Sequence, residues 1–185
     1  MLEQNQKLEE IKNHCKVSSK VIRVIQIIAI VGLVGSIVGT IWCFVMKETI
    51  NTEIAKQVSN GVATIENFKI DGGMLKLAIN YDEMFQRGDY ATPLAINFCI
   101  ATVITAITAY LLTLLKKVFD NLIKDNNPFS DANMKYIKTG FIVMSVILLI
   151  FAGIGAGVIC GLLCWCIYSI LEYGRVLQVE VDETL

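Results

Sequence analysis

Long stretches without a charged residue alternate with short charged blocks along this chain. Three of these stretches, residues 24–46, 93–115 and 139–171, contain no Asp, Glu, Lys, Arg or His. About 20 apolar residues, wound as a helix, cross the ~30 Å hydrocarbon core of a bilayer. Each stretch is long enough to span a membrane, so the pattern predicts an all-α integral membrane protein.

The third stretch is too long for one ordinary span. As a straight helix rising ~1.5 Å per residue, residues 139–171 would reach about 50 Å. Fitting that length inside the hydrocarbon core would need a tilt of more than about 50°, whereas membrane helices tilt by about 0–40°. The chain must therefore project beyond the membrane here or reverse its direction.

A cluster of glycines marks the centre of this stretch. Gly153, Gly155 and Gly157 fall within five residues, and glycine adopts positive φ angles freely. We therefore expect a helical hairpin that turns at these glycines, with Lys138 and Glu172 paired as ions at its open end. This predicts a four-span helical bundle. The alternative is three spans, in which the glycines pack one continuous helix against a neighbour.

The distribution of charge predicts the orientation of the spans. Residues 1–23 and 116–138 each carry five Lys or Arg against three acids, whereas residues 47–92 carry five against seven. Because Lys and Arg are enriched in cytoplasmic loops, we expect the two basic segments and both termini in the cytoplasm. The expected order is an N-terminal arm at 1–23, spans at 24–46, 93–115, 139–153 and 158–171, an external loop at 47–92, a cytoplasmic loop at 116–138 and a cytoplasmic tail at 172–185.

The external loop carries signals of local structure. Residues 62–70 and 74–79 contain β-compatible runs on either side of Asp71-Gly72-Gly73, which predicts a small β-hairpin. Residues 81–90 are polar enough for a helical turn or a loop. Thr92 followed by Pro93 predicts the start of the second span, with Thr92 as the N-cap.

The other connections are short helices or turns. The N-terminal arm has a weak helical stripe, so it is either an amphipathic helix that merges with the first span near Val21 or a solvated arm. The second span is expected to continue as a helix into the cytoplasm and to end before Pro128. Ser130 is then placed to cap a new helix that begins at Asp131.

The residues that commonly carry chemistry do not form a recognisable site. The only histidine is His14, and no zinc-binding spacing of Cys and His occurs. Cys160 and Cys164 share a helical face, but small buried side chains explain them better than a metal site does. Thr102, Thr105 and Thr108 lie along one face; they could line a pore, but such hydroxyls more often bond within their own helix. We expect no enzyme, no metal and no cofactor.

The best candidate surface lies at the cytoplasmic ends of the helices. If the hairpin forms, the loop before the third span and the acidic tail come to the same side of the membrane, where they either seal the bundle or dock a cytoplasmic protein. The residues of this candidate surface are Asn127, Pro128, Phe129, Ser130, Glu172, Tyr173, Gly174, Leu177, Gln178, Glu180 and Asp182.

The same residues carry a resemblance to a known family. Asn127-Pro128-Phe129-Ser130 and the ending from Leu171 to Leu185 resemble the bacterial membrane proteins grouped as the family of unknown function number 2975 (DUF2975). The resemblance implies a four-span architecture in a bacterial plasma membrane. It also implies a possible partnership with a small helix-turn-helix regulator, because genes of the family often lie beside genes of such regulators. It implies no established activity.

Two functional classes follow. The first is a small accessory or regulatory membrane protein, lodged in the lipid bilayer, that engages a cytoplasmic protein partner without contacting nucleic acid directly. The alternative is a transport-related or immunity-type membrane protein that binds a small molecule or peptide. The Gly35–Gly39 spacing in the first span favours close helix packing, either within the bundle or against a second copy in a homo-oligomer.

Overall fold

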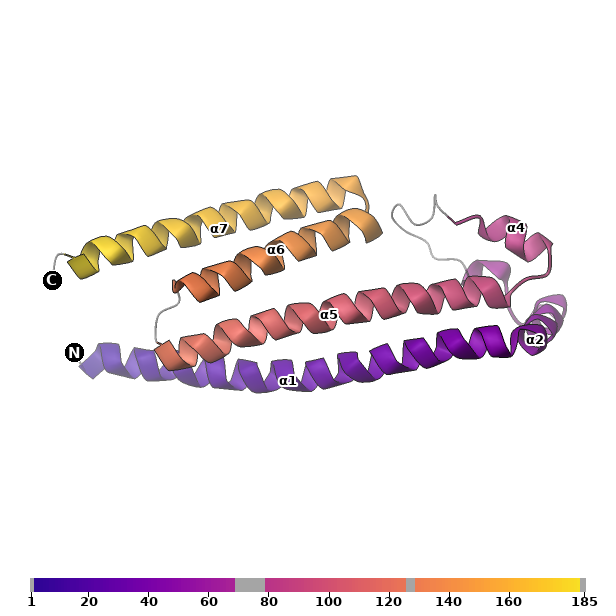
Figure 1. Ribbon diagram of the computed structural model, residues 1–185, viewed down its shortest axis with the longest axis horizontal. Coiled ribbons are helices and arrows are strands. Elements are labelled where there is room, and N and C mark those ends of the chain that lie inside the picture. The colour runs from indigo at the N-terminus through magenta and orange to yellow at the C-terminus, as the bar shows by residue number, and fades with distance from the viewer. Residues whose placement is uncertain (1, 69–78, 126–128, 184–185) are drawn as a thin grey trace.

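The computed structural model describes residues 2–68, 79–125 and 129–183, and their regular structure is entirely helical (Figure 1). The elements are α1 (Leu2–Val45), α2 (Lys47–Ser59), the 3₁₀ turn η1 (Ile65–Phe68), α4 (Tyr81–Gln86), α5 (Ala91–Asp125), α6 (Asp131–Phe151) and α7 (Ile154–Glu183). Four of them, α1, α5, α6 and α7, are long and apolar enough to cross a membrane. The prediction of an all-α, four-span membrane protein is confirmed, and the three-span alternative is wrong because the chain reverses between α6 and α7.

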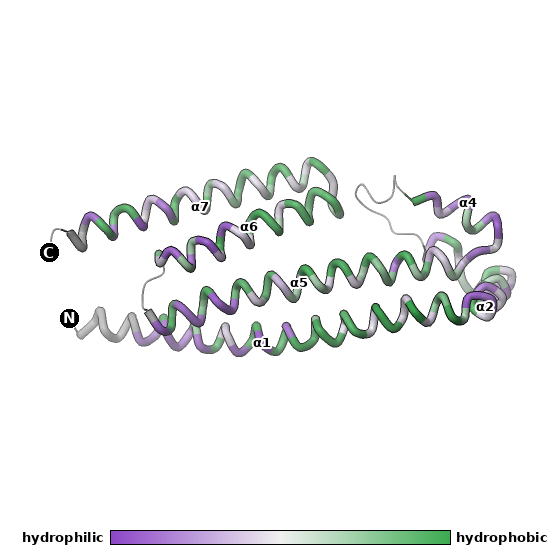
Figure 2. Tube along the Cα trace, in the orientation of Figure 1, coloured by the Kyte–Doolittle hydropathy of each residue, from purple (hydrophilic) through white to green (hydrophobic). Residues whose placement is uncertain are grey.

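The long helices extend beyond the uncharged stretches that predicted them. The N-terminal arm and the first span form the single helix α1, so the helical interpretation of the arm is confirmed. Large apolar side chains such as those of Ile28 and Val31 are exposed along this helix, as expected where lipid rather than water surrounds the protein. The hydropathy of the chain follows this pattern, with hydrophilic residues gathered mainly where α1 starts and α7 ends, and hydrophobic residues along the rest of the long helices (Figure 2).

α1 and α5 form one antiparallel pair. Gln26 Nε2 donates a hydrogen bond of 2.9 Å to Thr113 Oγ1, and Thr102 Oγ1 lies 3.0 Å from Ser36 Oγ. Near the other end, a Cβ added at Gly39 would lie 2.9 Å from the ring of Phe98. Close glycine packing therefore brings these helices together within the bundle.

α6 and α7 form the second antiparallel pair, and their turn is shorter than the glycine cluster predicted. Of the three glycines, only Gly153 lies in the turn. Its φ is 98°, and glycine adopts such a positive φ easily, which lets the chain reverse after Ala152. Gly155 and Gly157 belong to the first turn of α7 instead. The reversal thus centres on residue 153 rather than 155, which changes every pairing between the two helices.

A hydrophobic cluster closes one end of the molecule, where α2 and α4 pack against the ends of α1 and α5. Its buried residues are Cys43, Ile50, Ile54, Tyr81, Phe85, Tyr90, Ala91 and Ala95. We call this the capped end. The helical turn expected in residues 81–90 is confirmed as α4.

The predicted β-hairpin is not present in the described residues. Its first strand was expected in residues 62–70, but Ile65–Phe68 form a 3₁₀ turn and the residues just before them are turn and bend. The expected turn at Asp71–Gly73 and most of the second strand lie outside the described residues. The helix α2, which the sequence did not predict, instead supplies Ile50 and Ile54 to the hydrophobic cluster.

The start of α5 is capped by residues other than Thr92. The helix begins at Ala91, and Asp89 Oδ1 accepts a hydrogen bond of 3.1 Å from the Thr92 backbone N–H. Asn51 Oδ1 accepts from the backbone N–H groups of Tyr90 and Ala91. Partial burial raises the pKa of Asp89, but hydrogen bonds from Lys47 and Thr92 outweigh it and hold the pKa below its ordinary value. The carboxylate therefore stays charged at the positive end of the helix.

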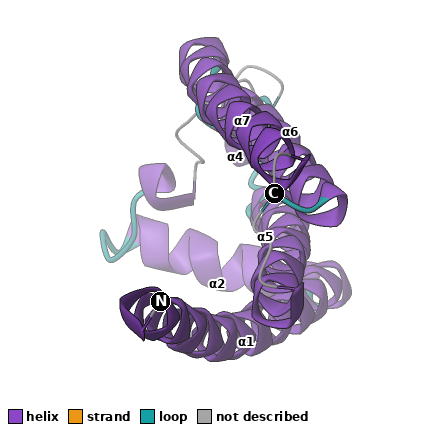
Figure 3. Cartoon of the chain, turned by 90° about the vertical axis from the view of Figure 1, so that its left-hand side faces the viewer, coloured by secondary structure: helices purple, strands orange, loops and turns teal. Residues whose placement is uncertain are grey.

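The four long helices are arranged in a row rather than around a central axis. Viewed along the helices, α5 and α6 lie between α1 and α7 (Figure 3). The ends of α6 and α7 at their turn fall short of the capped end of α1 and α5 (Figure 1). The Lys117 ammonium lies over the ring of Tyr136 where α6 meets α5. Counting along both helices from this pair, Phe151 is level with Thr102, which is about 14 Å from Pro93 along α5.

Candidate functional site at the basic end

The end opposite the capped end gathers the start of α1 and the end of α7 (Figure 1), and most Lys and Arg residues belong to the helix ends found there. We call it the basic end. The α1–α5 pairing places Arg23 opposite Lys116, and the α5–α6 pairing places Lys138 near the same level. In all three helices the uncharged stretch starts at that level. Arg23, Lys116 and Lys138 therefore mark one boundary of the membrane.

A carboxylate joins α1 and α5 just outside this boundary. Ser19 Oγ donates a hydrogen bond of 2.8 Å to Asp120 Oδ1, and Lys116 forms an ion pair with the same carboxylate. Lys116 and Asp120 lie one helical turn apart in α5, the spacing at which opposite charges stabilise a helix. The hydrogen bond from Ser19 links this ion pair of α5 to α1.

Two asparagines join α5 and α6. Asn121 Nδ2 donates a hydrogen bond of 3.0 Å to Asn133 Oδ1, and the side chain of Asn133 is fully buried. One turn deeper, the Lys117 ammonium lies 5.3 Å from the centre of the Tyr136 ring, within the range of a cation–π contact. These two contacts fix the pairing of the helices, because both relate the same levels of α5 and α6.

At the basic end, the contacts between α6 and α7 differ from the predicted one. The predicted ion pair between Lys138 and Glu172 is wrong. The Lys138 ammonium lies 5.6 Å from the centre of the Tyr168 ring, and Arg175 pairs with Asp131. Because the turn centres on Gly153, each residue of α6 faces a residue of α7 about one turn nearer the turn than predicted.

The residues predicted for the cytoplasmic surface divide into two groups. Phe129 and Ser130 hold the structure together: a Cβ added at Gly174 would lie 3.0 Å from the Phe129 ring, and Ser130 Oγ accepts from the Asn133 backbone N–H, which confirms the predicted cap. Asn127 and Pro128 lie outside the described residues.

The other predicted residues belong to a continuation of α7. We call residues 172–183 the α7 extension, which is helical to Glu183. Tyr173 is 65% exposed and Leu177 is 43% exposed, while Gln178 is half-buried. Glu172 and Glu180 are exposed. Asp182 is part of the helix, but its side chain lies outside the described residues.

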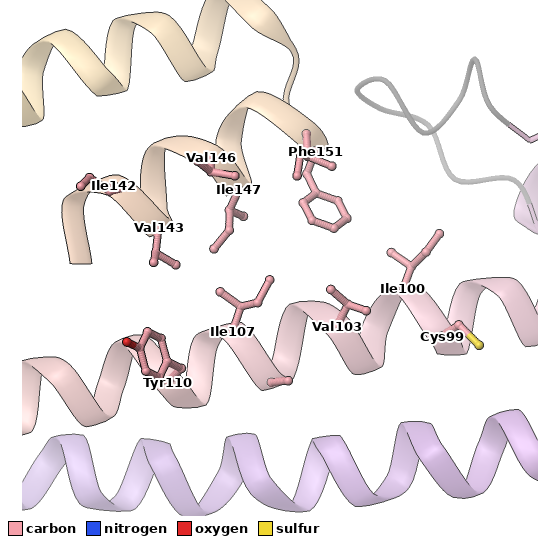
Figure 4. A pocket seen from close by; sticks show the side chains of 12 residues that line it. Cys99, Ile100, Val103, Ile107, Tyr110, Ile142, Val143, Val146, Ile147 and Phe151 are labelled. Atoms are coloured by element: carbon pink, nitrogen blue, oxygen red, sulfur yellow. The ribbon is translucent and has the colours of Figure 1, made fainter. Parts of the chain in front are cut away.

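Two grooves run between the long helices. The first, of about 660 Å³, lies between α5 and α6 and is lined by apolar side chains such as Val103, Ile107, Val146 and Ile147 (Figure 4). The second, of about 510 Å³, lies between α6 and α7 and has a different character, because Lys138 and Glu172 stand at its mouth. The second groove reaches the basic end.

Sequence reasoning missed several residues of this end. Asn121, Asp131 and Arg175 make contacts between helices, and Asp120 joins two helices. The opposite charges of Asp131 and Arg175 are equally distant from Gly153, but those of Lys138 and Glu172 are equally distant from Gly155, so charge alone did not choose between the two centres. Among the described residues, no three His, Cys, Asp or Glu side chains come close enough to hold a metal ion.

Comparisons with known proteins add no relationship. No family model, no curated protein and no solved structure matches the chain. The resemblance to the family of unknown function number 2975 therefore stays a prediction.

Proposed function

We propose that the protein is a small multipass membrane protein with an accessory or regulatory role, and that the α7 extension binds a cytoplasmic protein. The proposal places it in a bacterial plasma membrane with both termini in the cytoplasm. The role is one of binding rather than catalysis. It rests on one observation: an exposed apolar stripe on α7 that lies beyond the level of the boundary residue Lys138.

The stripe consists of Tyr173, Val176 and Leu177. Their spacing puts them on one face of the helix, and Tyr173 is 65%, Val176 51% and Leu177 43% exposed. The pairing of α6 with α7 sets Tyr168 level with Lys138. Tyr173 and Leu177 then stand about 8 and about 14 Å beyond the membrane boundary. Apolar side chains at that height have left the hydrocarbon core, and burial against a partner removes them from water.

The charge around the stripe indicates the kind of partner. Residues 172–185 contain four acids and one Arg, which gives a net charge of −3. We infer a protein with an apolar groove and a basic rim, since opposite charges guide association. An acidic helix disfavours direct contact with nucleic acid. A small helix-turn-helix regulator is the partner that the family resemblance implies.

Photo-crosslinking tests the docking surface. A photoreactive amino acid at Leu177 should trap a soluble protein in living cells. Replacing both Tyr173 and Val176 by Ser should lower the yield more than tenfold, because losing two central apolar contacts costs more than about 1.4 kcal/mol. The matched control is the same photoreactive residue at Leu162, which is 62% exposed on the same helix but lies about 9 Å inside the membrane boundary, where it should trap lipid. An unchanged protein yield in the double variant would contradict the proposal.

Cysteine labelling tests the orientation separately. In a background without the six native cysteines, Val62→Cys lies beside the capped end and Val179→Cys lies in the α7 extension. The side chains are 76% and 50% exposed. In intact cells, a membrane-impermeant thiol reagent should label only Val62→Cys, and cell lysis should make both react. Labelling of Val179→Cys from outside would place the tail on the external side and overturn the orientation.

The transport-related alternative has less support from the spans. The hydroxyl of each of Thr102, Thr105 and Thr108 donates to a backbone carbonyl of its own helix. This arrangement satisfies the hydroxyl within the helix, which favours packing over a polar pore. The Thr102 hydroxyl oxygen also lies 3.0 Å from Ser36 Oγ in the contact between α1 and α5.

A further inference from the structure

The groove between α6 and α7 combines an apolar body with a charged mouth. Its volume is about 510 Å³; Phe141, Ile142 and Trp165 line the body, and Lys138 and Glu172 stand at the mouth. Its floor is formed by small residues, since a Cβ added at Gly161 would lie 3.7 Å from Ser145 Oγ. The small residues Ser145 and Gly161 face each other here, and they leave space between α6 and α7 that the neighbouring larger side chains do not fill.

The depth of the groove matches one half of a bilayer. Lys138 lies at the membrane boundary together with Arg23 and Lys116, as shown above. From Lys138 to Val146 the groove follows α6 for about 12 Å toward the membrane centre. A lipid of the leaflet at the basic end would therefore have its headgroup beside Lys138 and its first acyl carbons beside Phe141 and Trp165.

The two charged residues at the mouth are attached to their helices at different levels along the membrane normal. Tyr168 is level with Lys138, so Glu172 lies one helical turn further from the membrane centre, about 6 Å. Lys138 also contacts the ring of Tyr168, which holds its ammonium at the groove. A positive group near the hydrocarbon and a negative group outside it form a site for a headgroup with the reverse order of charges.

We propose that this groove binds a phospholipid with a primary ammonium headgroup, of the phosphatidylethanolamine type. The phosphate, which lies nearer the glycerol, binds Lys138, and the terminal ammonium donates hydrogen bonds to Glu172. The quaternary ammonium of a choline headgroup has no N–H to donate. A phosphatidylglycerol headgroup is anionic and carries no positive group of its own, so nothing in it would pair with the Glu172 carboxylate as an ammonium does. The charge pattern therefore selects the ethanolamine type.

Fluorescence of Trp165 reports directly on the groove. The chain has two tryptophans, so Trp42→Phe leaves Trp165 as the only reporter. The full-length protein is placed in bilayers that contain brominated phosphatidylethanolamine, phosphatidylcholine or phosphatidylglycerol in turn, in competition with unlabelled lipid. We expect the ethanolamine lipid to quench Trp165 with an apparent affinity about tenfold above that of the choline lipid, as one charge-assisted hydrogen bond supplies.

Variants at the mouth separate the proposal from general lipid contact. Glu172→Gln should reduce the affinity for the ethanolamine lipid to that for the choline lipid, and Glu172→Lys should shift the preference to phosphatidylglycerol. Glu10→Gln, an exposed acid in the N-terminal arm, is the charge-matched control and should change nothing. Circular dichroism of each variant verifies that the helices are intact, and the gain of a new preference in Glu172→Lys cannot come from unfolding.

Three results would overturn the proposal. The first is equal quenching by the three lipids. The second is an ethanolamine preference that survives Glu172→Gln. The third is displacement of the brominated lipid by soluble phosphoethanolamine, which would assign the site to a free metabolite-sized ligand instead. The proposal does not depend on the docking of a protein to the α7 extension, so either can fail alone.

Discussion

Replacing Gly157 by Ala should destabilise the protein more than any other single methyl group added to its long helices. A Cβ at this position would lie 2.5 Å from Leu149 Cβ and 2.6 Å from Leu149 Cα. A backbone atom cannot move aside as the end of a flexible side chain can, so α6 and α7 must separate. We expect a loss of at least about 1–3 kcal/mol, the usual cost of overpacking, measured by unfolding of the purified protein in detergent.

Gly155→Ala is the matched control for this prediction. Gly155 lies two residues away in the first turn of α7, and an added Cβ would meet nothing within 4 Å. Alanine favours a helix over glycine by about 1 kcal/mol, so this variant should be neutral or slightly more stable. Equal destabilisation of both variants would mean that glycine is needed here for backbone flexibility and not for the close approach of Leu149.

Replacing Asn133 by Ala should loosen the contact between the two helical pairs. Asn133 is 0% exposed, and its Oδ1 accepts a hydrogen bond of 3.0 Å from Asn121. The variant leaves the half-buried Asn121 amide without this acceptor. Losing the hydrogen bond and leaving a partly shielded donor unpaired costs about 1 kcal/mol, which should appear as an equal loss in the free energy of unfolding.

Thr139→Ala controls for the loss of a polar group from the same helix. The Thr139 hydroxyl donates to the Lys135 carbonyl within α6, a bond of 2.8 Å that makes no contact with another helix. Its removal should change stability by less than about 0.5 kcal/mol. The double variant Asn121→Ala/Asn133→Ala should lose less than the sum of the single losses, because it leaves neither partner unpaired. Additive losses would contradict a direct bond between the asparagines.

The number of spans could be predicted from the sequence because it depends on length and charge alone. Residues 139–171 cannot fit a bilayer as one helix, and glycine at their centre permits a reversal. Which glycine reverses the chain is a different question. Gly153, Gly155 and Gly157 have the same intrinsic freedom, and the close contact between Gly157 and Leu149 decides among them. That contact exists only in three dimensions.

The predicted β-hairpin shows how a short alternating pattern can mislead. Residues 62–70 alternate for too few residues to distinguish a strand from a turn, and the structure has a 3₁₀ turn at Ile65–Phe68. The helix α2 could have been recognised. Ile50, Ile54 and Val58 follow each other at intervals of four residues, which is the spacing of an apolar helical face, and all three lie in or against the hydrophobic cluster.

The candidate site was predicted in place but not in its contacts. The charge distribution and the hairpin put the loop and the tail at the same end of the helices. The pairs themselves depend on the register of each helix against its neighbour, and a shift of the turn from residue 155 to residue 153 is enough to replace Glu172 by Tyr168 opposite Lys138. Charged residues alone do not determine such a register.

The unequal lengths of the two helical pairs create a mismatch between the shorter pair and the surrounding bilayer. From the boundary at Lys138, the uncharged part of α6 reaches about 20 Å, whereas the uncharged part of α5 reaches about 35 Å. The free backbone groups at the Ala152–Gly153 turn need water or lipid headgroups, so the far leaflet has to dip toward the turn along one flank of the protein. A dip of this kind costs a fraction of a kcal/mol per Å. Two copies that face each other across it would share that deformation, which gives self-association in the membrane a driving force that needs no specific contact.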